Sequence, residues 1–366
     1  MKNLALLAVS ALFSLVAAEL ALRIVFDPID HLKVDLVEDP VLNHRIDAHA
    51  SGHDEWGFRN KAGVRAAEIV AVGDSMTYGI MATADEAWPM HLQRMSGRAV
   101  YSAALGGYGP LHYLHLVKRA LKEIKPEAVI VALYFGNDLM DAYNLAYSSD
   151  AWADWRDPET VETLDASEFV FAERASGRFL GGLRSWLASN SMLYRIVTQS
   201  ALFDGVRRRE AGERVGDAFF ADHLGERILI DVDRVLPLVD RAHPRIVEGR
   251  RLTLKALNEI ADATEAAGAK LYVALFPVKE DVAHPDLTGA APPALAVSLD
   301  QLAENMTYHR EWLAEALAAR NVPLIVLKPV LQQALAEEMV YPMTDGHPNG
   351  RGYARAAQAI LDRIGE

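Results

Sequence analysis

Cysteine is absent from the 366-residue chain, which excludes disulfides, thiolate metal sites and a cysteine nucleophile. Basic residues are few relative to acidic ones, 37 against 50, and the formal charge is -13. A surface of that sign repels phosphate backbones, and no run of Lys and Arg offsets it, so we expect no nucleic-acid partner. The composition that remains, 51% hydrophobic and 24% charged, is that of a globular protein with one large domain, with or without an insertion.

The N-terminus carries a long apolar run. Lys2 is followed by apolar and small residues from Leu4 to Ala18, and the apolar pattern continues to Phe26. A run of this length suits a signal peptide or a membrane helix. We expect residues 1–26 to be an uncleaved single-pass anchor in the inner membrane, with the remaining chain periplasmic or otherwise extracytoplasmic. Secretion after cleavage at the small residues Val16-Ala-Ala18 is the alternative.

Five near-continuous apolar runs read as buried strands, at residues 68–72, 98–102, 128–134, 270–276 and 322–327. Helical patterns lie between and after them, near residues 86–96, 110–124, 250–267, 307–320 and 351–363. This alternation predicts a parallel sheet covered on both faces, a three-layer α/β/α sandwich. We expect residues 27–65 to be a tether and residues 66–366 to be the domain.

One stretch lacks strands of this quality. Residues 139–249 contain Trp152, Trp155 and Trp186, and we interpret them as a mainly helical insertion between the third and fourth strands. A lid, an acceptor-binding surface and plain structural cover are all open as its role. A second, short helical excursion is expected at residues 285–306.

Chemistry is expected in the turns after the strands, because ligands of such sheets bind outside the carboxyl ends of the strands. Ser75 lies in the turn after the first strand, Gly107 in the second turn and Asn137 in the third. The strand order 2-1-3-4-5 would bring these three residues to one point. Together they offer a hydroxyl nucleophile and three oxyanion donors: the N–H groups of Ser75 and Gly107 and the amide of Asn137.

A serine nucleophile also needs a base. His347 lies on a loop just before the last helix, where its side chain could reach the sheet edge. Asp345, two residues earlier, could bond the far ring nitrogen and fix the tautomer.

These motifs resemble a known superfamily. Gly73-Asp-Ser75, Gly107, Gly136-Asn-Asp138 and Asp345-Gly-His347 look like blocks I, II, III and V of the SGNH/GDSL hydrolases, in the same order. The resemblance covers residues 66–137 and 250–363. It implies the flavodoxin-like SGNH fold with five parallel strands, Ser75 as nucleophile, Gly107 and Asn137 as oxyanion donors, and His347 with Asp345 as the base pair. It implies no metal and no organic cofactor.

The spacing of the acid departs from the usual pattern. The superfamily usually places it three residues before the histidine, where this chain has Thr344. Asp345 resembles the Asp-x-His arrangement of alginate and related polysaccharide O-acetyltransferases. The segments Trp56–Arg59 and Phe276–Lys279 are similar to envelope-located bacterial members.

Other polar residues are expected to be structural. Asp74 and Asp138 fit turns that they hold by bonding backbone N–H groups. His112 and His115 share a helix face but have no carboxylate partner at metal-ligand spacing, so they fit a solvated face better than a metal site.

The residues predict a serine-dependent ester hydrolase that works through an acyl-enzyme, on an acyl ester or an acetylated glycan. A polysaccharide O-acetyltransferase with the same triad is the first alternative. It ranks second because no membrane acyl-donor domain is fused to the chain. The second alternative is a non-catalytic scaffold or carbohydrate-binding protein of a polysaccharide export complex, with biosynthesis proteins as partners.

Overall fold

The computed structural model describes residues 2–61, 67–158, 181–199, 219–287 and 291–365. The chain divides into two compact units, which we describe separately. The N-terminal unit comprises residues 1–37, 46–57 and 170–216, and the sheet unit comprises residues 38–45, 58–169 and 217–366. All of the predicted site residues lie in the sheet unit.

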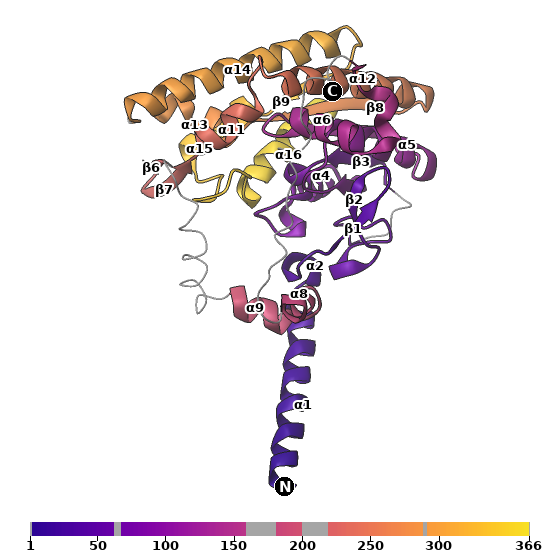
Figure 1. Cartoon of the computed structure of the whole chain (residues 1–366), viewed down its shortest axis with the longest axis vertical. Helices are drawn as coiled ribbons and strands as arrows, with labels where there is room; N and C mark the ends of the chain where they lie inside the picture. The colour runs from indigo at the N-terminus through magenta and orange to yellow at the C-terminus, as the bar shows by residue number, and fades with distance from the viewer. Residues whose placement is uncertain (1, 62–66, 159–180, 200–218, 288–290, 366) are drawn as a thin grey trace. The chain divides into compact units, whose positions relative to one another are not determined.

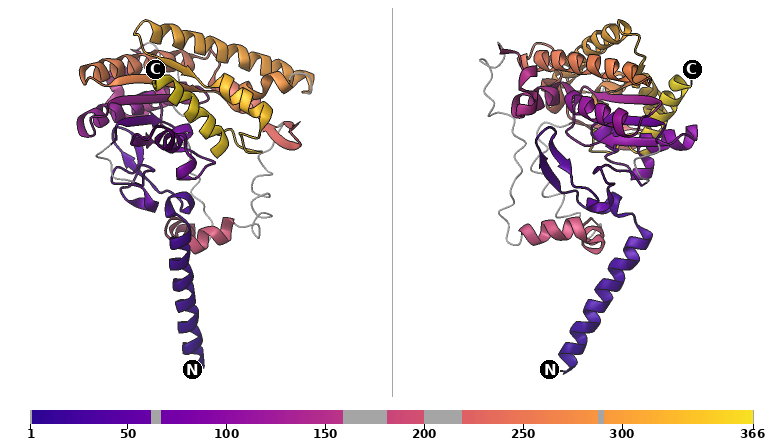
Figure 2. Two further views of the ribbon diagram at one scale, coloured as in Figure 1. Left: turned by 180° about the vertical axis from the view of Figure 1, so that it is seen from behind. Right: turned by 90° about the vertical axis from the view of Figure 1, so that its right-hand side faces the viewer.

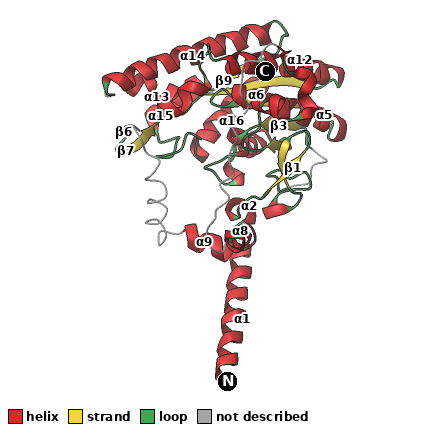
Figure 3. Ribbon diagram, viewed as in Figure 1, coloured by secondary structure: helices red, strands yellow, loops and turns green. Residues whose placement is uncertain are grey.

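A parallel five-stranded sheet forms the centre of the sheet unit (Figure 1). Its order is β4–β3–β5–β8–β9, which is the predicted order 2-1-3-4-5. Figure 3 shows these strands in yellow among the helices. The strands are β3 (Ile69–Gly73), β4 (Val100–Ala104), β5 (Ala128–Tyr134), β8 (Lys270–Phe276) and β9 (Leu324–Val326). The predicted α/β fold with five parallel strands is confirmed.

Burial explains why these apolar runs pair as a sheet. Every residue of β3 and β4 is buried, and so is all of β5 except Tyr134. A strand covered on both faces needs apolar residues at every position instead of at alternate ones. The register places Gly73 beside Ala104, so β3 and β4 end at the same level. The turns that follow them therefore share one edge of the sheet.

Two groups of helices cover opposite faces of the sheet (Figure 2). One group is α4 (Trp88–Ser96) and α16 (Gly350–Ile364), which pack against each other. The other group is α5 (Pro110–Glu123), α6 (Asp138–Ser148) and α12 (Pro244–Ala266). Helix α12 packs against both α5 and α6. This is the expected three-layer arrangement.

Some helices differ from the predictions. Pro293–Ala318 is one continuous helix, α14, where we expected a short excursion followed by a separate helix. Helix α12 begins at Pro244, six residues before the predicted start and inside the predicted insertion. Proline at the first turn is a helix-start signal, and a prediction from hydrophobic periodicity alone does not include it. The remaining elements around them are α3 (Ser75–Tyr78), η3 (Ala84–Glu86), η4 (Asp150–Trp155), α11 (Val232–Val235), η7 (Leu236–Leu238), α13 (Lys279–Leu287) and α15 (Lys328–Glu337).

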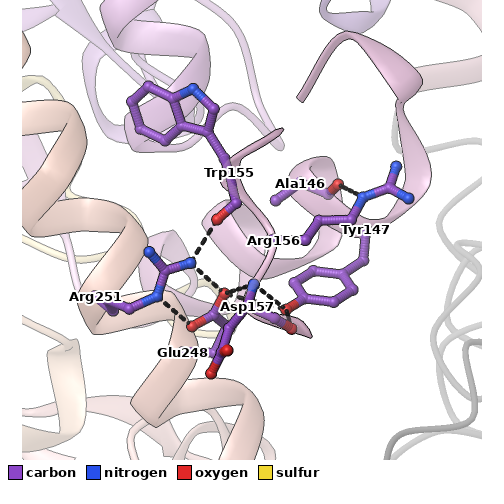
Figure 4. A network of polar contacts seen from close by, with 7 residues as sticks. All are labelled: Ala146, Tyr147, Trp155, Arg156, Asp157, Glu248 and Arg251. Carbon is purple, nitrogen blue, oxygen red and sulfur yellow. Dashed lines mark hydrogen bonds and ion pairs between the residues drawn. The ribbon is translucent and has the colours of Figure 1, made fainter. Parts of the chain in front are cut away.

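The first part of the 139–249 stretch is held tightly on α12. A Cβ atom on Gly249 would lie 1.9 Å from the carbonyl oxygen of Leu139, so only glycine lets α6 and α12 approach this closely. Farther along, the buried carboxylate of Glu248 accepts hydrogen bonds from Tyr147 and the Asp157 N–H and pairs with Arg251 (Figure 4). Residues 159–180 and 200–218 of the predicted insertion lie outside the described residues.

The end of the same stretch contains strands, although we predicted it to be mainly helical. β6 (Phe219–His223) and β7 (Glu226–Ile230) form an antiparallel hairpin. The two residues of its turn, Leu224 and Gly225, have φ angles of 52° and 80°. Two left-handed residues match the twist of a two-residue hairpin turn, but Leu is an uncommon choice there. Of the two turn residues, only Gly225 is therefore one that signals a hairpin turn in the sequence.

The N-terminal unit is helical where the apolar run predicts it. The longer helices of this unit are α1 (Lys2–Val25), α8 (Gly181–Asn190) and α9 (Met192–Gln199). Glu19 accepts hydrogen bonds from the first N–H groups of α9, and Arg23 donates to the carbonyl of Asn190 at the end of α8. Glu19 and Arg23, the two charged residues within the apolar run, thus bond backbone groups at helix ends that have no partner within their own helix.

The expectation of a membrane-spanning helix is not confirmed. Among the residues that the structure describes, no helix combines the length and apolar character that a membrane crossing requires. Residues 27–65, predicted as a tether, contain short regular elements: α2 (Pro28–His31), β1 (Leu36–Asp39), β2 (Asn43–Ile46) and η1 (Ala50–Gly52).

Candidate active site

Ser75 occupies the first position of α3, directly after β3. Ser75 is only 8% exposed, and the preceding Asp74 is fully buried. The Asp74 carboxylate accepts a hydrogen bond from the Met76 N–H at 2.9 Å, which caps the helix and holds the turn as predicted. A Cβ atom on Gly73 would lie 2.1 Å from the Thr77 hydroxyl, so glycine is required at this turn.

The structure brings His347 and Asp345 to this serine. The Nε2 atom of His347 lies 2.8 Å from the Ser75 hydroxyl oxygen. On the other side of the ring, Nδ1 lies 2.5 Å from a carboxylate oxygen of Asp345. The same oxygen accepts the His347 backbone N–H at 2.8 Å, so the two-residue spacing closes a tight turn around the pair. Because the carboxylate can only accept, Nδ1 carries the hydrogen and Nε2 is free to accept the Ser75 proton.

Local electrostatics favour this arrangement. Burial acts to raise the pKa of Asp345, but the hydrogen bonds from His347 outweigh it and hold the pKa below the usual value. The carboxylate therefore stays ionised beside the imidazole. Asp74 behaves differently, because burial raises its pKa to about 6 even though the Met76 N–H and the nearby His347 act to lower it.

The predicted oxyanion donors lie beside the serine. A Cβ atom on Gly106 would be 3.6 Å from the Cβ of Ser75, so the turn after β4 passes close to Ser75. Gly107 has a φ angle of 81°, a left-handed conformation that favours glycine. Asn137 immediately precedes α6, and its side chain hydrogen-bonds the Asp74 carboxylate. Ser75, Gly107 and Asn137 thus meet at one edge of the sheet.

Asp138 holds the third turn, as predicted. Its carboxylate accepts hydrogen bonds from the Tyr134 N–H at 2.8 Å and the Tyr113 hydroxyl at 2.7 Å. Burial is the main reason that its pKa is raised well above the ordinary value, with the Asp74 carboxylate adding to the effect. A group used in this way supports the turn and does not face a substrate.

His44 is a neighbour of the site that sequence reasoning missed. Its Nε2 atom lies 3.4 Å from the Gly106 carbonyl oxygen, and its ring lies 3.7 Å from the position that a Cβ on Gly107 would occupy. Side chains of the sheet unit hold the segment from Pro40 to His44 in place through its backbone carbonyls. The four bonds are Ser149 to Pro40, Trp152 to Val41, His112 to Leu42 and Tyr108 to His44. A lone histidine in a polar stretch without clear periodicity gave no signal for this placement.

The solvated-face prediction is wrong for His112. This residue is 3% exposed; its Nδ1 accepts the Gly109 N–H at 3.0 Å, so its Nε2–H donates to the Leu42 carbonyl at 3.2 Å. Burial lowers the pKa of His112 to about 3, and the ring stays neutral. In the described parts of the chain, no group of three or more His, Asp and Glu residues is arranged to hold a metal ion.

The assembled groups can perform acyl transfer. A hydroxyl, an imidazole and a carboxylate are hydrogen-bonded in series, and the turns that carry Gly107 and Asn137 end at the same edge of the sheet. This is the set of groups that nucleophilic attack on an ester requires.

Solved structures similar to this chain come from bacterial lipolytic proteins. A lipase/acylhydrolase from Enterococcus faecalis is 14% identical, with 81% of this chain and 95% of that chain covered and a TM-score of 0.34. A member of the lipolytic protein G-D-S-L family from Veillonella parvula is 12% identical, with coverages of 82% and 100% and a TM-score of 0.36. The psychrotrophic esterase EstA from Pseudoalteromonas sp. is 10% identical, with coverages of 81% and 97% and a TM-score of 0.34. No curated protein matches the chain.

The family assignment comes from a different comparison. The model of the GDSL-like lipase/acylhydrolase family matches residues 71–355, which is most of the chain and includes every predicted site residue. The chain therefore belongs to the GDSL-like lipase/acylhydrolase family and is a serine hydrolase that acts on ester bonds.

Proposed function

We propose that Ser75, His347 and Asp345 form the catalytic triad of an acyl-ester hydrolase. The observation that carries the proposal is the 2.8 Å contact between the Ser75 hydroxyl and Nε2 of His347. Nε2 takes the hydroxyl proton while Ser75 Oγ attacks the ester carbonyl carbon. The same proton then passes to the leaving alcohol as the acyl-enzyme forms. Water, deprotonated by Nε2, attacks the acyl carbon, and the imidazolium returns this proton to Ser75 Oγ as the acyl–oxygen bond breaks and the acid leaves.

The donors at the site support the tetrahedral intermediate in this scheme. The N–H of Ser75 lies at the first turn of α3, where the backbone donors are not used within the helix. Gly107 adds a second backbone N–H. The Asn137 amide has two N–H groups, and the one not engaged by Asp74 serves the oxyanion. Loss of one such donor typically costs about 3 kcal/mol of barrier.

For the substrate we propose an O-acetyl group on a glycan. Support comes from the two-residue spacing of Asp345 and His347, which resembles the polysaccharide O-acetyltransferases. Water as acceptor gives an esterase, and a sugar hydroxyl gives a transferase with the same residues.

The test is to incubate the purified protein with an aryl acetate, with and without an oligosaccharide. We expect free acetate to form faster than acetylated sugar, and Ser75→Ala to abolish both products. Acetylated sugar forming faster than acetate would overturn the hydrolase assignment. Wild-type protein that releases no acid from any ester would overturn the catalytic role.

We further propose that the enzyme works outside the cytoplasm. Support comes from the apolar run that begins at Leu4 and from the exposed apolar side chains that α1 carries, such as Leu12 and Phe13. Cell fractionation with carbonate washing tests it. Protein that stays in the membrane fraction indicates an anchor, recovery in the medium indicates cleavage and secretion, and recovery in the cytosol contradicts the proposal.

A further inference from the structure

The loop that carries Asp345 and His347 projects from the core. It runs from Pro342 to His347 between α15 and α16, and Met343 on it is 50% exposed. A loop of this kind does not hold an imidazole to within hydrogen-bonding distance of a hydroxyl unless something anchors it.

Two donors from outside the catalytic motifs bind carbonyls of this loop. The backbone N–H of Leu229, on β7, donates to the Met343 carbonyl at 2.7 Å. The ammonium of Lys279, at the start of α13, donates to the Asp345 carbonyl at 3.1 Å. The loop is thus held at two alternate residues, immediately before the histidine.

Lys279 is an unusual residue for a purely structural role. It is only 2% exposed, and a buried ammonium is costly unless charged or polar groups surround it. The charged groups that act on it are the carboxylates of Glu280, Asp345 and Asp231 and the guanidinium of Arg234. Burial lowers the pKa of Lys279, whereas the three carboxylates act to raise it.

The hairpin is itself fixed to the core next to Lys279. The ring of His223 on β6 donates to the Leu335 carbonyl in α15 at 2.7 Å. The backbone N–H of Asp231, just after β7, donates to the buried Glu280 carboxylate at 3.3 Å. Glu280 follows Lys279 in α13, so the two anchors of the catalytic loop are joined through this carboxylate.

We infer that Lys279 is a positioning residue for the catalytic loop and that the β6–β7 hairpin is the second part of the same clamp. The inference rests on the proposed role of the triad. It also gives the end of the 139–249 stretch a function, which is to hold the histidine of the site.

Lys279→Met is the main test, with Lys328→Met as the matched control. Lys328 is a partly buried lysine nearby in the fold whose ammonium pairs with the buried Asp281, and among the described contacts it has no bond to the catalytic loop. We expect Lys279→Met to lower kcat about 10- to 100-fold with little change in KM, because the imidazole is displaced from the serine. Lys328→Met should keep wild-type kcat at a similar loss of thermal stability.

The pH profile separates positioning from general stability. The Lys279 ammonium helps to lower the pKa of Asp345, so its removal favours protonation of this carboxylate, which then no longer accepts the Nδ1 hydrogen bond. The acid limb of kcat/KM should move to higher pH in Lys279→Met and stay in place in Lys328→Met. If both variants share the wild-type profile and kcat, the inference is overturned.

Two controls keep the test decisive. Should Lys279→Met fail to fold by circular dichroism, Lys279→Gln replaces it, because its neutral amide can hydrogen-bond the carboxylates that surround this position. The same loss of kcat and the same shift of the acid limb are then expected, and their absence refutes the inference. If wild-type protein is inactive, or Ser75→Ala is as active as wild type, the triad proposal fails instead.

Discussion

His347 Nε2 lies 2.8 Å from the Ser75 hydroxyl, although 272 positions separate the two residues in the chain. Packing of α16 against α4 brings the C-terminal region to the nucleophile, and the Tyr353 hydroxyl donates to the Ile80 carbonyl at 3.1 Å. Asn349 caps α16 through the N–H groups of Arg351 and Gly352. The histidine therefore sits between a fixed helix start and the clamped loop.

Asp345→Asn should lower kcat about a thousandfold or more while leaving the fold intact. One oxygen of Asp345 accepts both the His347 backbone N–H and Nδ1–H, so an asparagine that keeps Oδ1 at this place lacks the negative charge that stabilises the imidazolium. If its NH2 group takes this place instead, the turn loses the backbone bond and the ring is held in the wrong tautomer. Steady-state kinetics on an aryl acetate measure the effect. Asp85→Asn, an exposed carboxylate of a surface ion pair, is the control. An Asp345→Asn enzyme with wild-type kcat would remove Asp345 from the triad.

Gly107→Ala should lower kcat at least about tenfold. Its φ of 81° is unfavourable for alanine by roughly 1–2 kcal/mol, so the turn shifts and carries its N–H away from the oxyanion. Gly268→Ala has a matching φ of 69° with open space around the Cβ position, far in sequence from the site motifs. It should lose similar stability and no activity. Equal activity losses in both variants would contradict an oxyanion role for Gly107.

Stability should fall as the pH drops from 7 to 5, in part because of His112. Burial lowers its pKa to about 3 in the folded protein, while the unfolded chain binds a proton near the ordinary value of 6.5. The stabilisation is thus complete above that value and is lost as the pH falls toward 3, by about 2 kcal/mol at pH 5.

His112→Gln isolates this contribution. The glutamine can accept the Gly109 N–H and donate to the Leu42 carbonyl but does not titrate. Urea unfolding at both pH values should show a smaller loss of unfolding free energy for the variant. Equal losses in the variant and the wild type would mean that His112 is not kept neutral by burial.

Gly249→Ala should destabilise the sheet unit by roughly 2 kcal/mol or more, because the new methyl group would overlap the Leu139 carbonyl. Gly182→Ala, in α8 with open space around it, should leave stability unchanged or slightly higher. Thermal unfolding followed by circular dichroism compares the two. A Gly249→Ala protein as stable as wild type would show that α6 and α12 are not in tight contact.

Much of this architecture could be predicted because buried parallel strands are apolar throughout and the site motifs follow them directly. Ser75, Gly107 and Asn137 could be placed together from strand order alone. The approach of His44 to Gly107 and the bond of Lys279 to the catalytic loop could not, because no periodicity links a single residue to a turn elsewhere in the chain. The prediction divided α14 into two helices although the sequence between them contains no break signal. The hairpin at Leu224 was missed because leucine is atypical in such a turn.

Labelling with a fluorophosphonate tests the central claim most directly, since this reagent phosphonylates a serine activated by a neighbouring base. Wild-type protein should gain one adduct, mapped to Ser75 by mass spectrometry, and Ser75→Ala should gain none. His347→Ala should react far more slowly. A folded wild-type protein that gains no adduct across a range of pH values, or gains it on another residue, would contradict the account and favour a non-catalytic scaffold.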